Sequence, residues 1–202
     1  MENMICNDIP ITKNVYDGKF INLRTIETDN YKYEYMHESR CEGHIVSIMP
    51  VHINGNMIVR NEFTPAWSAY GNHISSITGG WEREKHETPF HTAIEELREE
   101  AGIVLKDNSH ITSLGVVRGS KASDTVYHLF MVKLTDDNFT QVDIEGDGSF
   151  LESKAENLWA PCPTPSDPSW LGIGADPLLY VSYLRWTCGI EIPVNLEDYK
   201  NL

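Results

Sequence analysis

The segment GGWEREKHETPFHTAIEELREEAGI, residues 79–103, contains seven glutamates, four of them between positions 95 and 100. Its second half predicts a helix over residues 88–101. Thr88 suits the N-cap, Pro89 suits the first turn, and Gly102 can adopt the left-handed conformation that ends a helix. Because like charges repel, the close spacing of these carboxylates on one helix needs a physical explanation.

Helical periodicity separates an apolar face of this segment from an acidic one. At about 100° per residue, one stripe that faces the core collects Phe90, Ala93, Ile94, Leu97 and Ala101. Glu96, Glu99 and Glu100 form an adjoining stripe. Arg98 points away from that stripe and is expected to pair with Glu95 on the solvent side.

The three carboxylates of the acidic stripe repel one another. At a separation of about 6 Å, each pair costs roughly 0.7 kcal/mol in water and about 3 kcal/mol near a protein surface. A fully solvated acidic face tolerates this repulsion, and that is the plainer alternative. A stripe that borders the core needs a counter-charge, and Mg²⁺, which takes oxygen ligands and keeps several waters, fits that need.

Composition narrows the class of partner. The chain has 202 residues with 16 basic and 30 acidic side chains, a net charge of −14. Such a surface repels phosphate backbones, which argues against a nucleic-acid polymer. No run approaches the roughly 18 apolar residues that cross a bilayer, and the N-terminus MENMICNDIP lacks a signal-peptide pattern. We expect a cytoplasmic protein with no membrane partner and with free thiols at its four scattered cysteines.

The rest of the sequence predicts an α+β fold. Strands are expected at three places: within residues 14–38, at 111–117 and at 125–134. A hairpin is expected at 44–63, where Asn54 and Gly55 would supply two residues of positive φ in a two-residue turn. A C-terminal helix is expected at 178–186. Residues 146–170 are rich in proline and are predicted to form a loop, as a lid or a substrate-facing segment.

The acidic helix and the loop before it resemble the Nudix box. That pattern is Gly, five residues, Glu, seven residues, then Arg-Glu-apolar-x-Glu-Glu-x-Gly-apolar. Here Glu87 is followed by seven residues and then by EELREEAGI, residues 95–103. Two positions depart from the pattern. Six residues, not five, separate Gly80 from Glu87, and Glu95 stands where the box has its arginine.

The resemblance implies a Nudix α/β/α sandwich with a mixed sheet over residues 43–202, after a β-rich extension at 1–42. It also implies hydrolysis of a nucleoside diphosphate linked to another moiety, with Mg²⁺ or Mn²⁺ as cofactor. The metal ligands would be Glu96, Glu99, Glu100 and the carbonyl of Gly80. Glu87 and Glu95 complete the box. The general base would be Glu100 or Glu96; outside candidates for that role are Asp124, Glu145, Asp147 and Glu152.

The layout beyond the box resembles ADP-ribose pyrophosphatases, because a strand-rich extension precedes HIVSIMPV and because SDTVYHLFMV, residues 123–132, is similar to one of their strands. Thr125 stands where that subgroup has a loop glutamate, and Gly119 where it has a proline. ADP-ribose is the leading substrate, and the resemblance also implies a homodimer. Candidate substrate-binding residues are Trp67, Trp81, Arg60, Arg118 and Asp124.

Three alternatives stay open at this point. The first is a hydrolase of another nucleotide, such as a sugar nucleotide, NADH or a dinucleoside polyphosphate. The second is a Nudix-fold module that binds a nucleotide without turnover, which the charge inversion at Glu95 favours. The third treats the acidic helix only as an interaction surface.

Overall fold

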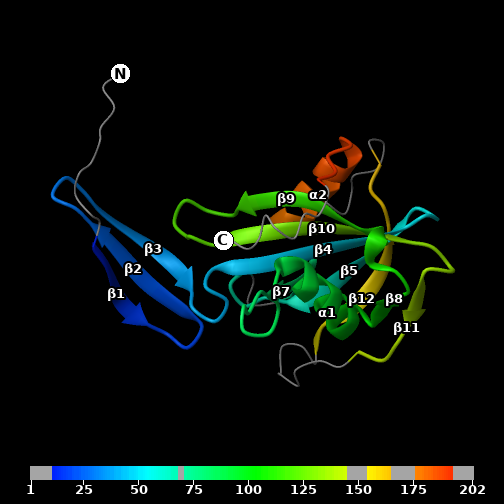
Figure 1. Ribbon diagram of the computed structural model, residues 1–202, viewed down its shortest axis with the longest axis horizontal. Helices are drawn as coiled ribbons and strands as arrows, with labels where there is room; N and C mark the ends of the chain where they lie inside the picture. Colours follow the sequence, from blue (N-terminus) through cyan, green and yellow to red (C-terminus); the bar gives the residue numbers. More distant parts are fainter. Residues whose placement is uncertain (1–10, 68–70, 145–153, 165–175, 193–202) are drawn as a thin grey trace.

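The computed structural model describes residues 11–67, 71–144, 154–164 and 176–192, and these residues form three sheets and two α-helices (Figure 1). The largest sheet has seven strands in the order β12-β5-β4-β10-β9, with β6 paired to β5 and β7 paired to β4. Its strands are β4 (His44–His52), β5 (Asn56–Phe63), β6 (Asn72–Ser75), β7 (Ile77–Gly80), β9 (Ile111–Arg118), β10 (Val126–Leu134) and β12 (Glu156–Pro161). Because β4 and β10 run parallel while the other pairs are antiparallel, the sheet is mixed.

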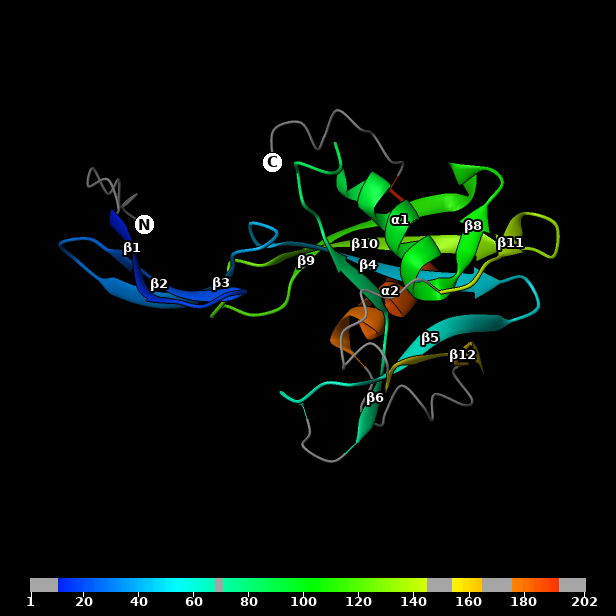
Figure 2. The same cartoon turned by 90° about the horizontal axis from the view of Figure 1, so that it is seen from below.

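One helix covers each face of this sheet, as Figure 2 shows. The helix α1 (Pro89–Ala101) buries Ala93 and Leu97 against Phe130 and its neighbours on one face. The helix α2 (Pro177–Thr187) buries Leu179 against the other face. Side chains of a strand alternate between faces, so β4 supplies Val46 and Ile48 to the first core, and Met49 and Val51 to the second. The predicted α+β fold, an α/β/α sandwich with a mixed sheet, is confirmed.

A separate three-stranded sheet precedes the sandwich and projects away from it (Figure 1, blue). It consists of β1 (Ile11–Asp17), β2 (Ile21–Glu27) and β3 (Lys32–Glu38). The loop between β9 and β10 holds it: the Met36 N–H donates to the Ala122 carbonyl at 2.8 Å, and His37 Nδ1 lies 2.8 Å from Asp124 Oδ2. The β-rich character predicted for this segment is present, while the boundary at residue 42 stays a prediction.

A small two-stranded sheet follows α1. It pairs β8 (Ile103–Leu105) with β11 (Phe139–Gln141). A short 3-10 helix, η1 (Asn108–His110), leads into β9. Gly102 lies between α1 and β8 with φ 65, which confirms the predicted left-handed helix end. Thr88 occupies the N-cap position, but its side chain makes no capping hydrogen bond, so that part of the prediction was wrong.

The β4–β5 hairpin differs from its prediction in the geometry of the turn. Gly55 has φ 87, whereas Glu42 is the one non-glycine residue with positive φ in the described ranges, so Asn54 does not share the turn in that way. The loop spans three residues, 53–55, and the Gly55 N–H donates to the His52 carbonyl at 3.0 Å. A three-residue loop needs a single left-handed residue at its end, and glycine supplies it.

The predicted loop at 146–170 contains a strand. Residues 156–161 form β12, which pairs antiparallel with β5 from Glu156 opposite Asn61 to Pro161 opposite Asn56. Within the predicted lid, 146–153 and 165–170 lie outside the described residues. The thiols of Cys41, Cys162 and Cys188 are free, and Cys6 lies outside the described part. No helix of that part is long and apolar enough to cross a membrane.

Candidate active site

The carboxylates of Glu96, Glu99 and Glu100, called the acidic ridge below, lie on the side of α1 next to β7. Burial of Ala93 and Leu97 fixes the rotation of the helix and therefore the direction of the ridge. A Cβ atom at Gly79 would come within 1.9 Å of both Cδ and Oε1 of Glu96. The glycine that makes room for the ridge is therefore Gly79. A Cβ at Gly80, the residue that the sequence favoured, would instead meet Cys41 Cβ at 3.1 Å.

Within the ridge, Glu96 is surrounded by more negative than positive charge. Burial, with the charges of Glu100, Glu99 and Glu95, raises the pKa of Glu96 from 4.5 to about 8, and Arg40 offsets this only in part. Desolvation and like charges both disfavour an ionised carboxyl group. A cation that binds beside Glu96 relieves both effects.

Glu100 has a strong partner that arrives from the sheet. Arg60 on β5 is 6% exposed, and its Nη1 forms an ion pair with Glu100 Oε2 and donates to the Glu100 carbonyl at 3.1 Å. The Arg60 Nε lies 3.4 Å from Glu62 Oε2, and Ser75 Oγ donates to Glu62 Oε1 at 2.7 Å. The sequence grouped Arg60 with substrate-binding residues and missed its contact with the ridge.

The strand β12 closes the same end of the helix. Asn157 Nδ2 donates to the Glu100 carbonyl at 2.6 Å, so this carbonyl accepts from two side chains. Carbonyls at a helix C-terminus lack partners within the helix and carry the negative end of its dipole, which favours a nearby cation such as Arg60. The alternating residues ENLWAP were the available signal for β12, and with it for Asn157.

The remaining carboxylates of the EELREE run have other partners. Glu95, at the position of the box arginine, forms an ion pair with His86 Nε2, a contact that carries a charge on both sides only when the histidine is protonated. Arg98 Nη2 donates to Glu99 Oε1 at 2.6 Å. The sequence predicted that Arg98 faces away from the ridge and pairs with Glu95. That direction was wrong, because the guanidinium reaches the neighbouring ridge residue.

Two hollows adjoin the Arg60–Glu100 pair. One has a volume of about 250 Å³ and includes Glu62, Phe63 and Thr78 in its lining, with the pair itself. The other, of about 50 Å³, is lined by the pair and by residues that include Glu99 and Asn157. The larger hollow has the dimensions of a site for part of a small ligand and opens beside the acidic ridge.

The donors of the ridge suit a hard divalent ion, because carboxylate oxygens are the ligands that Mg²⁺ prefers. Gly79 provides a cradle beside Glu96 that any side chain would fill. In the described ranges, however, no three His, Cys, Asp or Glu side chains are already arranged around one ion position. The ridge carboxylates fit such an ion by donor type, and Glu99 and Glu100 each contact a guanidinium group.

The two tryptophans predicted to bind the substrate lie in different environments. Trp81 is 2% exposed, its Nε1–H donates to the His86 carbonyl at 2.9 Å, and its ring meets His44 and His128 edge-on. It is a core residue with no free face for a base. Trp67 is half exposed and belongs to the lining of a larger cavity, of about 410 Å³, between the N-terminal sheet and the start of α2.

Of the other predicted residues that the structure describes, Arg118 ends β9, Asp124 lies in the loop between β9 and β10, and Glu87 precedes α1. Arg118 Nη1 donates to the Asp124 carbonyl at 2.9 Å, and the Asp124 carboxylate contacts His37, so Asp124 joins the N-terminal sheet to the sandwich. Thr125 is buried and contacts Ser123 Oγ at 2.6 Å. Glu87 is exposed in the bend before α1. Glu145, Asp147 and Glu152 lie outside the described residues.

Comparison with known proteins identifies the fold. No protein-family model matches the sequence, and no curated protein matches it. Solved structures do match. A crystal structure of an ADP compounds hydrolase superposes with a TM-score of 0.65 over 90% of this chain and 95% of that chain, at 15% identity. A Nudix hydrolase from Nitrosomonas europaea gives 0.52 over 75% of this chain and 93% of that chain, at 13% identity.

These likenesses show that the chain has the Nudix fold, as the sequence predicted. The acidic ridge lies on α1, the helix that carries the sequence resembling the Nudix box. Among proteins of this fold, the chain is similar over 90% of its length to the ADP compounds hydrolase.

Proposed function

We propose that this protein is a Mg²⁺- or Mn²⁺-dependent hydrolase that cleaves the pyrophosphate of a nucleoside diphosphate linked to another moiety and releases a nucleoside monophosphate. The observation that carries the proposal is the acidic ridge itself. Three glutamates meet on one side of α1, beside a glycine that leaves room for them, and their mutual repulsion contributes to the pKa of about 8 at Glu96. A cation bound beside Glu96 would relieve this repulsion.

The chain's own residues have distinct tasks in this proposal. Glu96, Glu99 and Glu100 would hold the ion, which would neutralise the pyrophosphate and lower the pKa of the attacking water. Glu100 or Glu96 would accept the proton from that water, because the buried hydroxyl of Thr125 cannot act as a carboxylate base. The carbonyl of Gly80 and the exposed Glu87 would brace the ion site.

ADP-ribose is the leading substrate. It is supported by the N-terminal sheet placed before the sandwich and by the structural likeness to an ADP compounds hydrolase. The hollow of about 250 Å³ beside Arg60 and Glu100 would take the phosphates and part of one flanking group. Sugar nucleotides, NADH and dinucleoside polyphosphates offer the same pyrophosphate to the ridge and are the alternatives.

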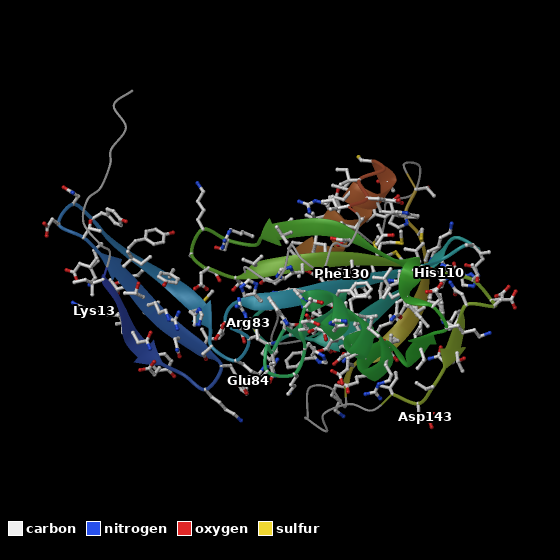
Figure 3. All side chains as sticks on the ribbon, in the orientation of Figure 1. Lys13, Arg83, Glu84, His110, Phe130 and Asp143 are labelled. Atoms are coloured by element: carbon white, nitrogen blue, oxygen red, sulfur yellow. The ribbon has the colours of Figure 1, made fainter. Side chains whose placement is uncertain are left out.

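The test is a substrate panel resolved by chromatography. The protein is incubated with Mg²⁺ or with Mn²⁺ and with ADP-ribose, NADH, UDP-glucose or diadenosine polyphosphate. Release of AMP or another monophosphate, abolished by Glu99→Gln and by excess chelator, supports the proposal. The matched control is Glu84→Gln, because Glu84 is an exposed glutamate in the loop before α1 (Figure 3).

One observation favours a second function. Glu95 stands where the box has its arginine and contacts His86, so position 95 brings no arginine to the ridge. A Nudix-fold module that binds a nucleotide without cleaving it is consistent with this charge inversion. Retention of a nucleotide with no monophosphate released under either metal would select that function and reject the hydrolase.

A further inference from the structure

Arg60 is a charged residue in a place where a charge is costly. It lies within β5, is 6% exposed, and needs a partner for its charge and for its N–H groups. Its guanidinium contacts Glu62 and Glu100. Glu100 receives two of them and lies 40 positions later in the chain. The contact therefore joins the seven-stranded sheet to the last turn of α1.

The guanidinium is held from both sides. Nη1 meets the carboxylate and the main-chain carbonyl of Glu100, while Nε faces Glu62, which Ser75 Oγ holds in turn at 2.7 Å. A planar fork fixed in this way sets both the rotamer of Glu100 and the position of the helix end. Lysine has a single head group on a flexible stem and cannot make the same set of contacts.

Position 95 lacks the positive charge that would stabilise the ridge from within the helix. Glu95 adds a fourth carboxylate there, raises the pKa of Glu96 further, and contacts His86 on its own side. A cation for the C-terminal end of the ridge must then come from another element. Arg60 is buried at that end and in contact with a ridge carboxylate.

We propose that Arg60 is a positioning residue of the metal site: it fixes Glu100 and supplies, from β5, the positive charge that α1 lacks at position 95. The inference rests on the proposed function in one respect, that the ridge binds a divalent ion. Arg60 acts on the ion through Glu100. Its loss would remove the guanidinium that holds the Glu100 carboxylate and would disorder the ion ligands.

The experiment measures Mn²⁺ binding by electron paramagnetic resonance, with the metal alone and no nucleotide. Arg60→Gln is expected to weaken Mn²⁺ affinity by about 10- to 100-fold, the usual effect of removing a group that orients a metal ligand. Arg60→Lys is expected to recover part of the loss, since it restores the charge without the fork. Arg83→Gln is the matched control, because Arg83 lies in the loop before α1 (Figure 3) and pairs with Glu42; it should stay within about twofold of wild type.

A double variant tests whether Arg60 works through Glu100. If it does, Arg60→Gln with Glu100→Gln should bind Mn²⁺ no more weakly than Glu100→Gln alone, because coupled residues are not additive. Losses that multiply would overturn the proposal, as would an Arg60→Gln protein that is folded by circular dichroism and binds Mn²⁺ within about twofold of wild type. Should Arg60→Gln fail to fold, wild-type affinity in Arg60→Lys would overturn it equally.

Turnover separates this proposal from the proposed function. With a cleaved substrate, Arg60→Gln should lower kcat by at least about tenfold, since the residue orders the ion ligands. A wild-type protein that binds Mn²⁺ but cleaves no nucleotide removes the hydrolase and leaves the Arg60 result standing. A wild-type protein that binds no Mn²⁺ overturns both.

Discussion

The carboxylate of Glu96 lies against the α-carbon of Gly79, so closely that a Cβ there would stand 1.9 Å from Cδ. We expect Gly79→Ala to displace Glu96, to lower turnover and Mn²⁺ affinity by about 10- to 100-fold, and to cost about 1–3 kcal/mol of stability through overpacking. Parallel assays of hydrolysis and urea unfolding measure these effects. Gly71→Ala is the control, since a Cβ at Gly71 meets no atom within 4 Å. Equal behaviour of the two variants would contradict the close approach.

Stability of the metal-free protein should depend on the charge of Glu96. Its pKa in the folded state, about 8, lies above the usual 4.5, so the folded state binds this proton more tightly than the unfolded chain does. The stability so gained is complete below about pH 4.5 and is lost as the pH rises through about 8. Glu96→Gln should remove this dependence and raise the melting temperature at pH 8.5, while it abolishes turnover. Calorimetric scans with chelator, from about pH 4.5 to 8.5, measure the melting temperature of both proteins. If the melting temperature of the wild type changes with pH in parallel with that of Glu96→Gln, Glu96 is not the cause of the pH dependence.

Restoring arginine at position 95 gives a directional test. Because Arg60 already neutralises Glu100, we expect Glu95→Arg to bring no gain in turnover in the wild-type background. In the Arg60→Gln background the same change should recover at least about threefold, since a cation one helical turn before Glu99 can then act on the ridge. Rates of the four proteins complete the cycle. If Glu95→Arg raises the rate both in the wild type and in Arg60→Gln, then the negative charge at position 95 lowers activity whether or not Arg60 is present.

The buried histidine pair predicts a second, opposite pH dependence. His128 Nε2 lies 3.0 Å from His44 Nδ1, and burial lowers the pKa of His128 from 6.5 to about 3. The unfolded chain therefore binds this proton more readily, so the stability is greatest above pH 6.5 and falls as the pH drops toward 3. Between pH 7 and 5 the pair accounts for a loss of about 2 kcal/mol, which His128→Gln should abolish. Urea unfolding at pH 7 and at pH 5 measures this loss of stability. If His128→Gln loses as much stability as the wild type, His128 is not the cause.

We propose that the N-terminal sheet makes the protein a homodimer. Large apolar side chains of this sheet are exposed, among them Val15, Tyr16 and Tyr33, and exposed apolar patches of this kind mark interaction surfaces. Light scattering should give the mass of two chains, and Val15→Glu with Tyr16→Lys should give one. The single change Val104→Glu, at an exposed position of β8, is the control. A wild-type monomer at micromolar concentration would end this proposal.

The order and type of the main elements could be predicted because local signals agree with the fold. Segments rich in β-branched and other apolar residues mark β9 and β10, and the spacing of Ala93 and Leu97 marks the buried face of α1. The strand β12 was missed because the prolines at its end and after it, at 161, 163, 165 and 168, outweighed its short alternation. The hairpin turn was assigned too few residues because the dipeptide Asn54-Gly55 occurs in loops of more than one length.

The site was predictable only where its residues are neighbours in sequence. Glu96, Glu99 and Glu100 share one helix, so helical geometry alone places them together. Their partners come from other elements, and no spacing rule links Arg60 or Asn157 to the end of α1. The choice between Gly79 and Gly80 depended on the rotation of β7 against the helix, which is a matter of packing.

The distance along the chain between Arg60 and Glu100 bears on how such sites diverge. If a cation from β5 replaces one on the helix, then the two positions are interchangeable in evolution, and a lineage that regains arginine at 95 is released from keeping one at 60. Related sequences should then carry a basic residue at one position or the other and seldom at neither. A search pattern limited to the helix and its preceding loop would pass over every member that uses the strand.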